Sequence, residues 1–222
     1  MMLGRPRLVQ SITAAAIVCA AAALSACAAT PAAAPTPRSV SQHFLKATFV
    51  ADYSFEVSGA VSLRGSVRWA QRDGTNVKVT VRVPDGPSEG VYTITRDGAR
   101  SEYCASLGKA STATCKDLGT AVDALLPYGP QLLNLADASA PSGDREFIGE
   151  KGTCFENVGR QECLSSDGVP LFSNGYFADI AIGAVRSPFA RSTESDNYDW
   201  GVAAQQIVVI SLSRKPGPED VS

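Results

Sequence analysis

The chain has 222 residues, 45% of them hydrophobic, and its 20 basic and 22 acidic residues leave a net charge of −2. The sequence contains no run of like charge and no basic stripe interleaved with aromatic residues, which excludes nucleic acid as an expected partner.

The N-terminal residues 1–26 have the three-part layout of a secretory signal peptide. Two arginines precede an apolar run that ends at Leu24, and Ser25, Ala26 and Cys27 follow it. This tetrad resembles the lipobox of bacterial lipoproteins, which implies that Cys27 receives acyl chains such as palmitate and becomes the first residue of the mature chain.

The apolar run is shorter than the roughly 20 residues that a bilayer span requires. Two or more acyl chains on one cysteine give stable membrane attachment. We therefore expect an extracytoplasmic protein that is anchored to the cell membrane or the outer membrane through its N-terminal lipid. An ordinary signal peptide that contains a cysteine and an N-terminal transmembrane anchor are the alternatives.

Residues 27–42 form a tether rich in alanine and proline, which buries too little apolar surface to fold. A single domain is expected over residues 43–222, a length that suits one sizeable core. Loss of Arg5 and Arg7 with the signal leaves 18 basic and 22 acidic residues. Residue 28, next to the lipidated cysteine, is alanine. An aspartate there would resemble an inner-membrane retention signal. The sequence therefore leaves open which membrane holds the anchor.

Four cysteines remain for the exported domain, because Cys19 lies in the signal and Cys27 takes lipid. An even number in an exported domain indicates two disulfides, for which three pairings exist. We favour Cys104–Cys115 and Cys154–Cys163, since each pair is close in sequence and brackets turn residues. The spacings lack the short knuckle of a zinc site, and no Cys-x-x-Cys redox motif is present.

Alternating apolar and polar residues predict five successive strands, over residues 49–57, 61–69, 77–83, 91–95 and 100–104. Short turns join them, which favours an antiparallel meander. One face is apolar, and the other carries Arg64, Arg68, Lys78 and Arg82.

Helical spacing of leucines between Leu118 and Ala136 predicts two short helices that cover the apolar face, the second beginning at Pro130. Strand character returns at Phe147–Ile148, Thr153–Asn157, Glu162–Ser165, Val169–Phe172, Tyr176–Ala184 and Gln205–Ser213. A polar loop is expected over Ser187–Asp199. The predicted class is α+β, mainly antiparallel β.

Two segments carry a family resemblance: the hairpin and cysteine of residues 96–104, and the paired-cysteine hairpin of residues 153–171. With the lipobox and the strand order, the chain from Phe44 to Ser213 resembles the LolA-like half-barrel superfamily, including LprG-like and LppX-like lipoproteins. The resemblance implies a curved sheet wrapped around helices, with acyl chains held in the gap. The polar loop near the C-terminus departs from the pattern, and no family ligand residue is carried over.

The resulting hypothesis is a lipoprotein that binds or carries a lipid or another hydrophobic ligand in an apolar cavity between sheet and helices. The expected lining residues are Phe49, Phe55, Leu63, Val67, Trp69, Val79, Val81, Leu125, Leu126 and Leu132. The alternative is a ligand-free scaffolding lipoprotein with a filled core and an envelope protein partner.

Catalysis is not expected, since the single histidine, His43, lies at the edge of the tether and no nucleophile is visibly activated. No cofactor and no metal are expected either.

Overall fold

The computed structural model describes residues 36–44, 46–59, 62–72, 74–86, 89–110, 112–119, 140–157, 159–175 and 202–221. All described elements belong to one compact unit, residues 34–222. The signal peptide and Cys27 lie outside the described residues, as do Leu125, Leu126 and Leu132 of the predicted helices. The same holds for the predicted strand Tyr176–Ala184 and the loop Ser187–Asp199.

The described residues up to 119 form a short helix and six strands. They are α1 (Pro37–Phe44), β1 (Phe49–Gly59), β2 (Leu63–Arg72), β3 (Asn76–Val83), β4 (Gly90–Asp97), β5 (Arg100–Leu107) and β6 (Thr114–Asp117). The second half forms β7 (Pro141–Phe147), β8 (Glu150–Asn157), β9 (Arg160–Leu164), β10 (Pro170–Ser173), β11 (Val202–Ser213) and α3 (Pro218–Val221).

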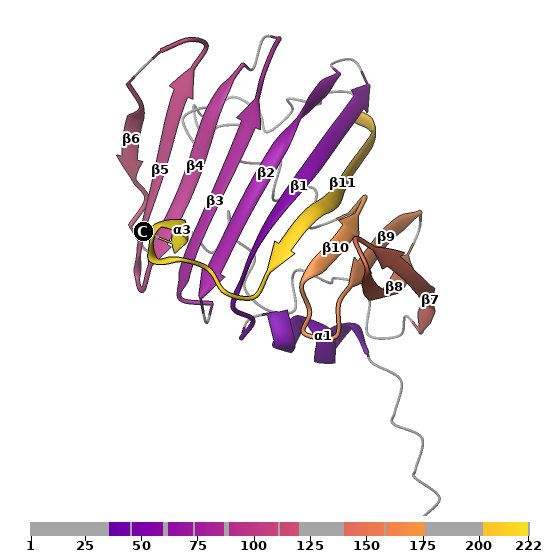
Figure 1. Cartoon of the computed structure of the whole chain (residues 1–222). Helices are drawn as coiled ribbons and strands as arrows, with labels where there is room; N and C mark the ends of the chain where they lie inside the picture. The colour runs from indigo at the N-terminus through magenta and orange to yellow at the C-terminus, as the bar shows by residue number, and fades with distance from the viewer. Residues whose placement is uncertain are drawn as a thin grey trace, which may run out of the picture. The chain divides into compact units, whose positions relative to one another are not determined.

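All the strands that the structure describes belong to one antiparallel sheet of 11 strands, in the order β6-β5-β4-β3-β2-β1-β11-β10-β9-β8-β7 (Figure 1). The predicted meander is confirmed, because β1 to β5 each pair with the next strand in sequence. The last strand, β11, lies between β1 and β10 and pairs with both. It therefore joins an N-terminal group of strands to a later group.

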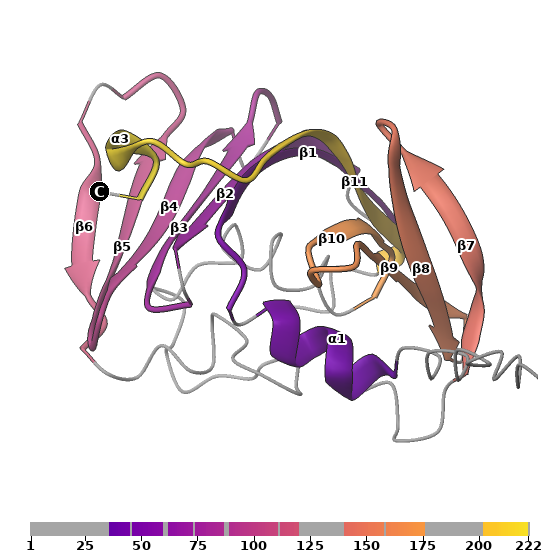
Figure 2. The ribbon, with the colours of Figure 1, turned by 60° about the horizontal axis from the view of Figure 1, so that its bottom comes forward.

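The sheet is curved, and α1 lies on its concave side (Figure 2). Phe44 of α1 contacts the rings of Phe49 and Trp69, with ring centroids 5.9 Å apart in each case. The residues that alternate with Phe49 along β1 therefore share the concave face. The prediction of a curved, mainly antiparallel sheet is confirmed.

The convex face carries the charged residues that the sequence places there. Arg68 of β2 donates to Asp52 of β1 at 2.9 Å and to Asp220 of α3 at 2.7 Å. The bond to Asp220 holds the C-terminal helix against the outside of β2 and β3.

The predicted strand Phe147–Ile148 is wrong, because β7 ends at Phe147. Phe147 pairs with Glu150, so Ile148 and Gly149 form a two-residue turn with φ angles of 48° and 80°. Such hairpin turns require positive φ at both central residues. Isoleucine is rare at positive φ. Its general preference for strands therefore led to the wrong prediction.

Helix α1, strand β6 and helix α3 have no counterpart in the prediction, and β7 overlaps a predicted strand only at Phe147. Helix α1 begins at Pro37, inside the segment expected to be a tether. Strand β6 pairs with β5 at one edge of the sheet, and all of its residues are exposed.

Candidate ligand-binding face

The concave face of the sheet carries the predicted apolar residues. The structure buries all of those that it describes and joins them in one hydrophobic cluster: Phe49, Phe55, Leu63, Val67, Trp69, Val79 and Val81. Cross-strand pairs such as Trp69 with Val79 and Val67 with Val81 place them side by side. Their role as cavity lining stays a prediction.

One end of this face is closed by α1. Gln71, at the end of β2, is buried and donates from Nε2 to the carbonyl oxygens of Phe44 at 2.6 Å and Ala47 at 3.2 Å. One carbonyl belongs to the last residue of α1 and the other lies just after the helix, where backbone acceptors need partners. Gln71 therefore fixes the helix end over the aromatic side chains beneath it.

The other part of the concave face contains buried polar groups. Glu162 of β9 is 1% exposed, and its Oε1 accepts a hydrogen bond of 3.0 Å from the hydroxyl of Ser173. The backbone N–H of Gly175 donates to the same hydroxyl oxygen at 3.1 Å. A side chain at Gly175 would lie 2.8 Å from Glu162 Oε1, so the glycine leaves room for the carboxylate.

The strand register places Glu162 on the concave face. Glu162 pairs with Ser173, Ser173 with Ile207, and Ile207 with Phe55. Residues that oppose each other across antiparallel strands point to the same side of the sheet. The carboxylate therefore belongs to the same surface as the predicted cavity residues.

Sequence reasoning placed Glu162 in a strand but gave it no role. A signal was available: once Cys154 is paired with Cys163, Phe155 lies opposite Glu162 in the hairpin. A charged residue opposite a buried phenylalanine would then have pointed to an inward-facing carboxylate.

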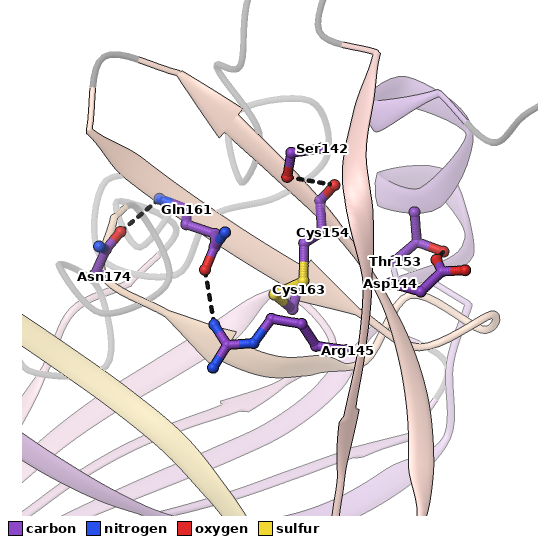
Figure 3. Close-up of a disulfide and its surroundings, with 8 residues drawn as sticks. All are labelled: Ser142, Asp144, Arg145, Thr153, Cys154, Gln161, Cys163 and Asn174. Carbon is purple, nitrogen blue, oxygen red and sulfur yellow. Dashed lines mark hydrogen bonds between the residues drawn. A yellow bond between two sulfur atoms is a disulfide. The ribbon is translucent and has the colours of Figure 1, made fainter.

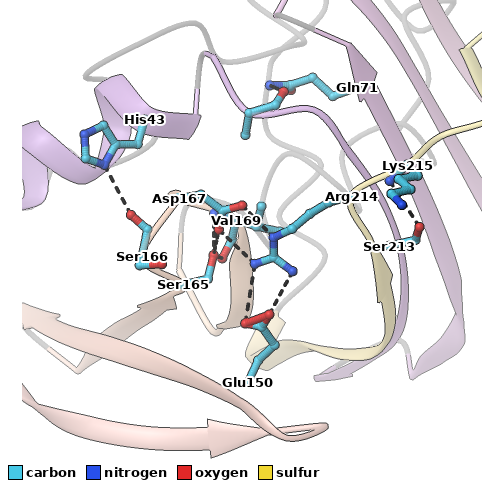
Figure 4. A network of polar contacts seen from close by, with 11 residues as sticks. His43, Gln71, Glu150, Ser165, Ser166, Asp167, Val169, Ser213, Arg214 and Lys215 are labelled. Carbon is cyan, nitrogen blue, oxygen red and sulfur yellow. Dashed lines mark hydrogen bonds and ion pairs between the residues drawn. The ribbon is translucent and has the colours of Figure 1, made fainter.

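A polar cluster holds the strand ends near α1 (Figure 4). Arg214, just after β11, donates to Asp167 with Nε at 2.8 Å and pairs with Glu150 at 2.8 Å. Burial of Asp167 opposes ionisation, but hydrogen bonds from Arg214 and Ser165 lower its pKa overall. The same attraction raises the pKa of Arg214. Nδ1 of His43 in α1 donates to the Ser166 carbonyl at 3.2 Å, which links the helix to this cluster.

Both predicted disulfides are confirmed. Cys154–Cys163 is buried and joins β8 to β9, and Arg145 extends past it to Gln161 at 2.9 Å (Figure 3). Cys104–Cys115 joins β5 to the edge strand β6. Glu102 lies beside this second bond, but sulfurs paired in a disulfide are not the thiolates that bind metals.

Two hollows on the surface are lined by described residues, most of which have polar or charged side chains. A hollow of about 310 Å³ is bounded by Thr95, Asp97, Arg100, Ser101, Glu102 and Asp117. A second, of about 630 Å³, is bounded by Pro141, Asp144, Glu150, Lys151, Thr153 and Ser166. Neither is lined by the predicted cavity residues, so these hollows do not supply the expected acyl site.

Several solved structures are similar to this chain. A chain of the Pseudomonas aeruginosa MucA/MucB complex is 15% identical, with a TM-score of 0.45, and the match covers 82% of this chain and 58% of that one. The chain therefore spans less than two thirds of that relative. An uncharacterised conserved protein from Thermus thermophilus is 11% identical, with a TM-score of 0.41 and coverage of 81% and 85%.

A LolA superfamily protein from Nitrosomonas europaea is also similar, at 10% identity and a TM-score of 0.35, with coverage of 85% of this chain and 97% of that one. That protein is a member of the superfamily that the sequence resembles. No family model and no curated protein matches the sequence. Within the described part of the chain, no helix has the length and apolarity needed to cross a bilayer.

Proposed function

We propose that this protein is a membrane-anchored envelope lipoprotein that binds or carries a lipid on its concave face and performs no catalysis. The observation that supports the proposal is the continuous cluster of buried apolar side chains on the concave side of a curved, open sheet. The two edge strands, β6 and β7, stand at opposite ends of the strand order.

The physical basis is the burial of hydrocarbon. A single curved sheet must cover its apolar face, and each square ångström of apolar surface removed from water contributes about 25 cal/mol. An acyl chain that lies along the strands gains this energy without any reactive group. The membrane anchor at Cys27 would keep the domain close to the lipids that it binds.

Trp69 provides a direct test, because it lies on the concave face, is 1% exposed and contacts α1. The experiment uses residues 28–222 with Trp200→Phe, so that Trp69 is the remaining tryptophan. The probe is the methyl ester of a dibrominated stearic acid, since bromine quenches tryptophan fluorescence on contact. We expect saturable quenching at one probe per protein and none with the unbrominated ester.

The matched control is the chain with Trp69→Phe, which keeps Trp200 and should not be quenched to the same extent. Fluorescence that is identical with brominated and unbrominated ester would contradict lipid binding on this face. That result would favour the alternative, a scaffolding lipoprotein with a filled core.

A further inference from the structure

The concave face differs in character between its two ends. Near α1 it presents the aromatic rings of Phe44, Phe49 and Trp69. Trp69 of β2 pairs with Ala51 of β1. Four residues further along β1, Phe55 pairs with Ile207 of β11. The same row continues across the sheet through Ser173 to Glu162. The same surface is therefore aromatic at one end and carries a carboxylate toward the other.

Further polar groups follow in the direction away from α1. Gln205 pairs with Val57, which places it on the concave face two residues beyond Ile207. Arg160 lies two residues before Glu162 on β9, and a side chain at Gly175 would lie 3.3 Å from its Cβ. Glu162 is thus the first of a group of polar residues on this part of the face, contributed by β9, the end of β10 and β11.

The burial of Glu162 is costly unless hydrogen-bond donors surround it. Among the buried polar residues that the structure describes, Glu162 alone carries a carboxylate. The others are Gln71, Ser101, Ser165 and Ser173. A carboxylate among apolar side chains is a strong acceptor for the hydroxyl or amine hydrogens of a bound molecule.

We infer that the concave face binds an amphiphile in one orientation, with its hydrocarbon chain toward Trp69 and a hydroxyl- or amine-bearing polar group at Glu162. The inference rests on the proposed function and names its ligand class. It distinguishes lipids whose polar part donates hydrogen bonds, such as monoacylglycerols, from lipids with the same chain and no donor.

The orientation follows from where the two groups lie on the sheet. Along the strands, four residues separate the row of Trp69 from the row of Glu162, or about 13 Å at 3.3 Å per residue. Across the sheet, four strand spacings separate β2 from β9, or about 19 Å at 4.8 Å each. A chain that leaves Glu162 toward the aromatic end therefore brings its methyl end nearer to Trp69 than its carboxyl end.

The test compares two probes that share a dibrominated stearoyl chain: the monoacylglycerol and the methyl ester. Quenching of Trp69 in the Trp200→Phe chain reports binding of both. We expect the monoacylglycerol to bind about tenfold more tightly, as a charge-assisted hydrogen bond to a carboxylate allows. Glu162→Gln should remove most of this preference, since the amide carries no charge.

Glu156→Gln is the matched control, because Glu156 lies on the adjacent strand β8 and is exposed. It should leave the preference unchanged. Orientation is read separately in the chain that retains Glu162, with monoacylglycerols brominated near the methyl end or near the carboxyl end. Bromines near the methyl end should quench Trp69 more strongly.

The outcomes separate the two ideas. If neither probe quenches Trp69, lipid binding itself fails. If both probes bind with equal affinity, or if bromines near the carboxyl end quench more strongly, lipid binding stands and the role of Glu162 is overturned. The comparison of the two probes and of the bromine positions requires no variant at Glu162, so a folding defect in Glu162→Gln does not obscure the result.

Discussion

At the scale of single residues, the concave face depends on a missing side chain. Gly65 of β2 pairs with Phe55, and a Cβ at Gly65 would collide with the carbonyl oxygen of Arg82 and lie 2.6 Å from the Phe55 ring. Overpacking of this kind typically costs about 1–3 kcal/mol. We expect Gly65→Ala to lower the free energy of unfolding by that amount in urea denaturation, whereas Ser66→Ala, on the outer face, should change it by about 0.5 kcal/mol or less. Equal stability of the two variants would mean that both the Arg82 backbone and the Phe55 ring can move to accommodate the methyl group.

The face of the sheet on which a side chain lies was predictable where apolar and polar residues alternate regularly. It was less predictable where the backbone departs from a regular strand. The apolar positions from Phe49 to Val81 lie on the predicted side, because side chains in a strand alternate strictly. Ile148 was misplaced because its turn conformation follows from the pairing of β7 with β8, which local preference does not reveal. Glu162 was left without a role because a carboxylate in a strand is normally exposed.

At the scale of elements, Asp167 joins three segments: its own loop between β9 and β10, Arg214 after β11, and Glu150 at the start of β8 through the shared arginine. Its pKa is lowered from the ordinary value of 3.8, so its ionised form stabilises the folded state above that pH. The stabilisation is lost as pH falls through the folded pKa. Asp167→Asn should therefore lower Tm at pH 7, and the difference from the unchanged protein should shrink as pH falls below about 4.

The control for this pH dependence is Asp85→Asn, which alters an exposed carboxylate in the turn after β3. It should give a pH profile of Tm close to that of the unchanged protein. A constant difference between Asp167→Asn and the unchanged protein from pH 7 to about pH 2 would show that the aspartate acts through packing and not through its charge.

Helix α1 was predictable in principle, although composition pointed to a tether. Ser39 donates its N–H to Thr36 Oγ1 at 3.2 Å, while Thr36 donates its N–H to Ser39 Oγ at 3.0 Å. This reciprocal pair resembles a capping box with serine in place of the usual glutamate or glutamine, and Pro37 stands at the first helical position, which favours a helix start. The helix is short, however, and its stability depends on burial of Phe44 beneath Gln71, a contact between segments distant in sequence.

At the scale of the whole molecule, the topology depends on β11, which the sequence predicts as a strand without indicating its partners. Short turns revealed the meander of β1 to β5, because neighbouring strands in sequence pair. No turn connects β11 to β1, and their pairing brings Val50 beside Ser213. Pairing between segments this far apart in the sequence depends on which apolar surfaces are buried together, and local sequence patterns do not specify this.

Because β11 pairs with β1 on one side and β10 on the other, we expect the two groups of strands to unfold together. Ile207 is fully buried at this junction, and Ile207→Ala should cost about 2–5 kcal/mol. Hydrogen exchange should then show lower protection in both β2–β4 and β8–β9, since global unfolding limits exchange of the most protected amides. Val208→Ala, partly exposed on the outer face of the same strand, is the control and should have a smaller effect on both groups. Loss of protection confined to β8–β9 would mean that the meander is stable alone and that β11 merely attaches the later strands to it.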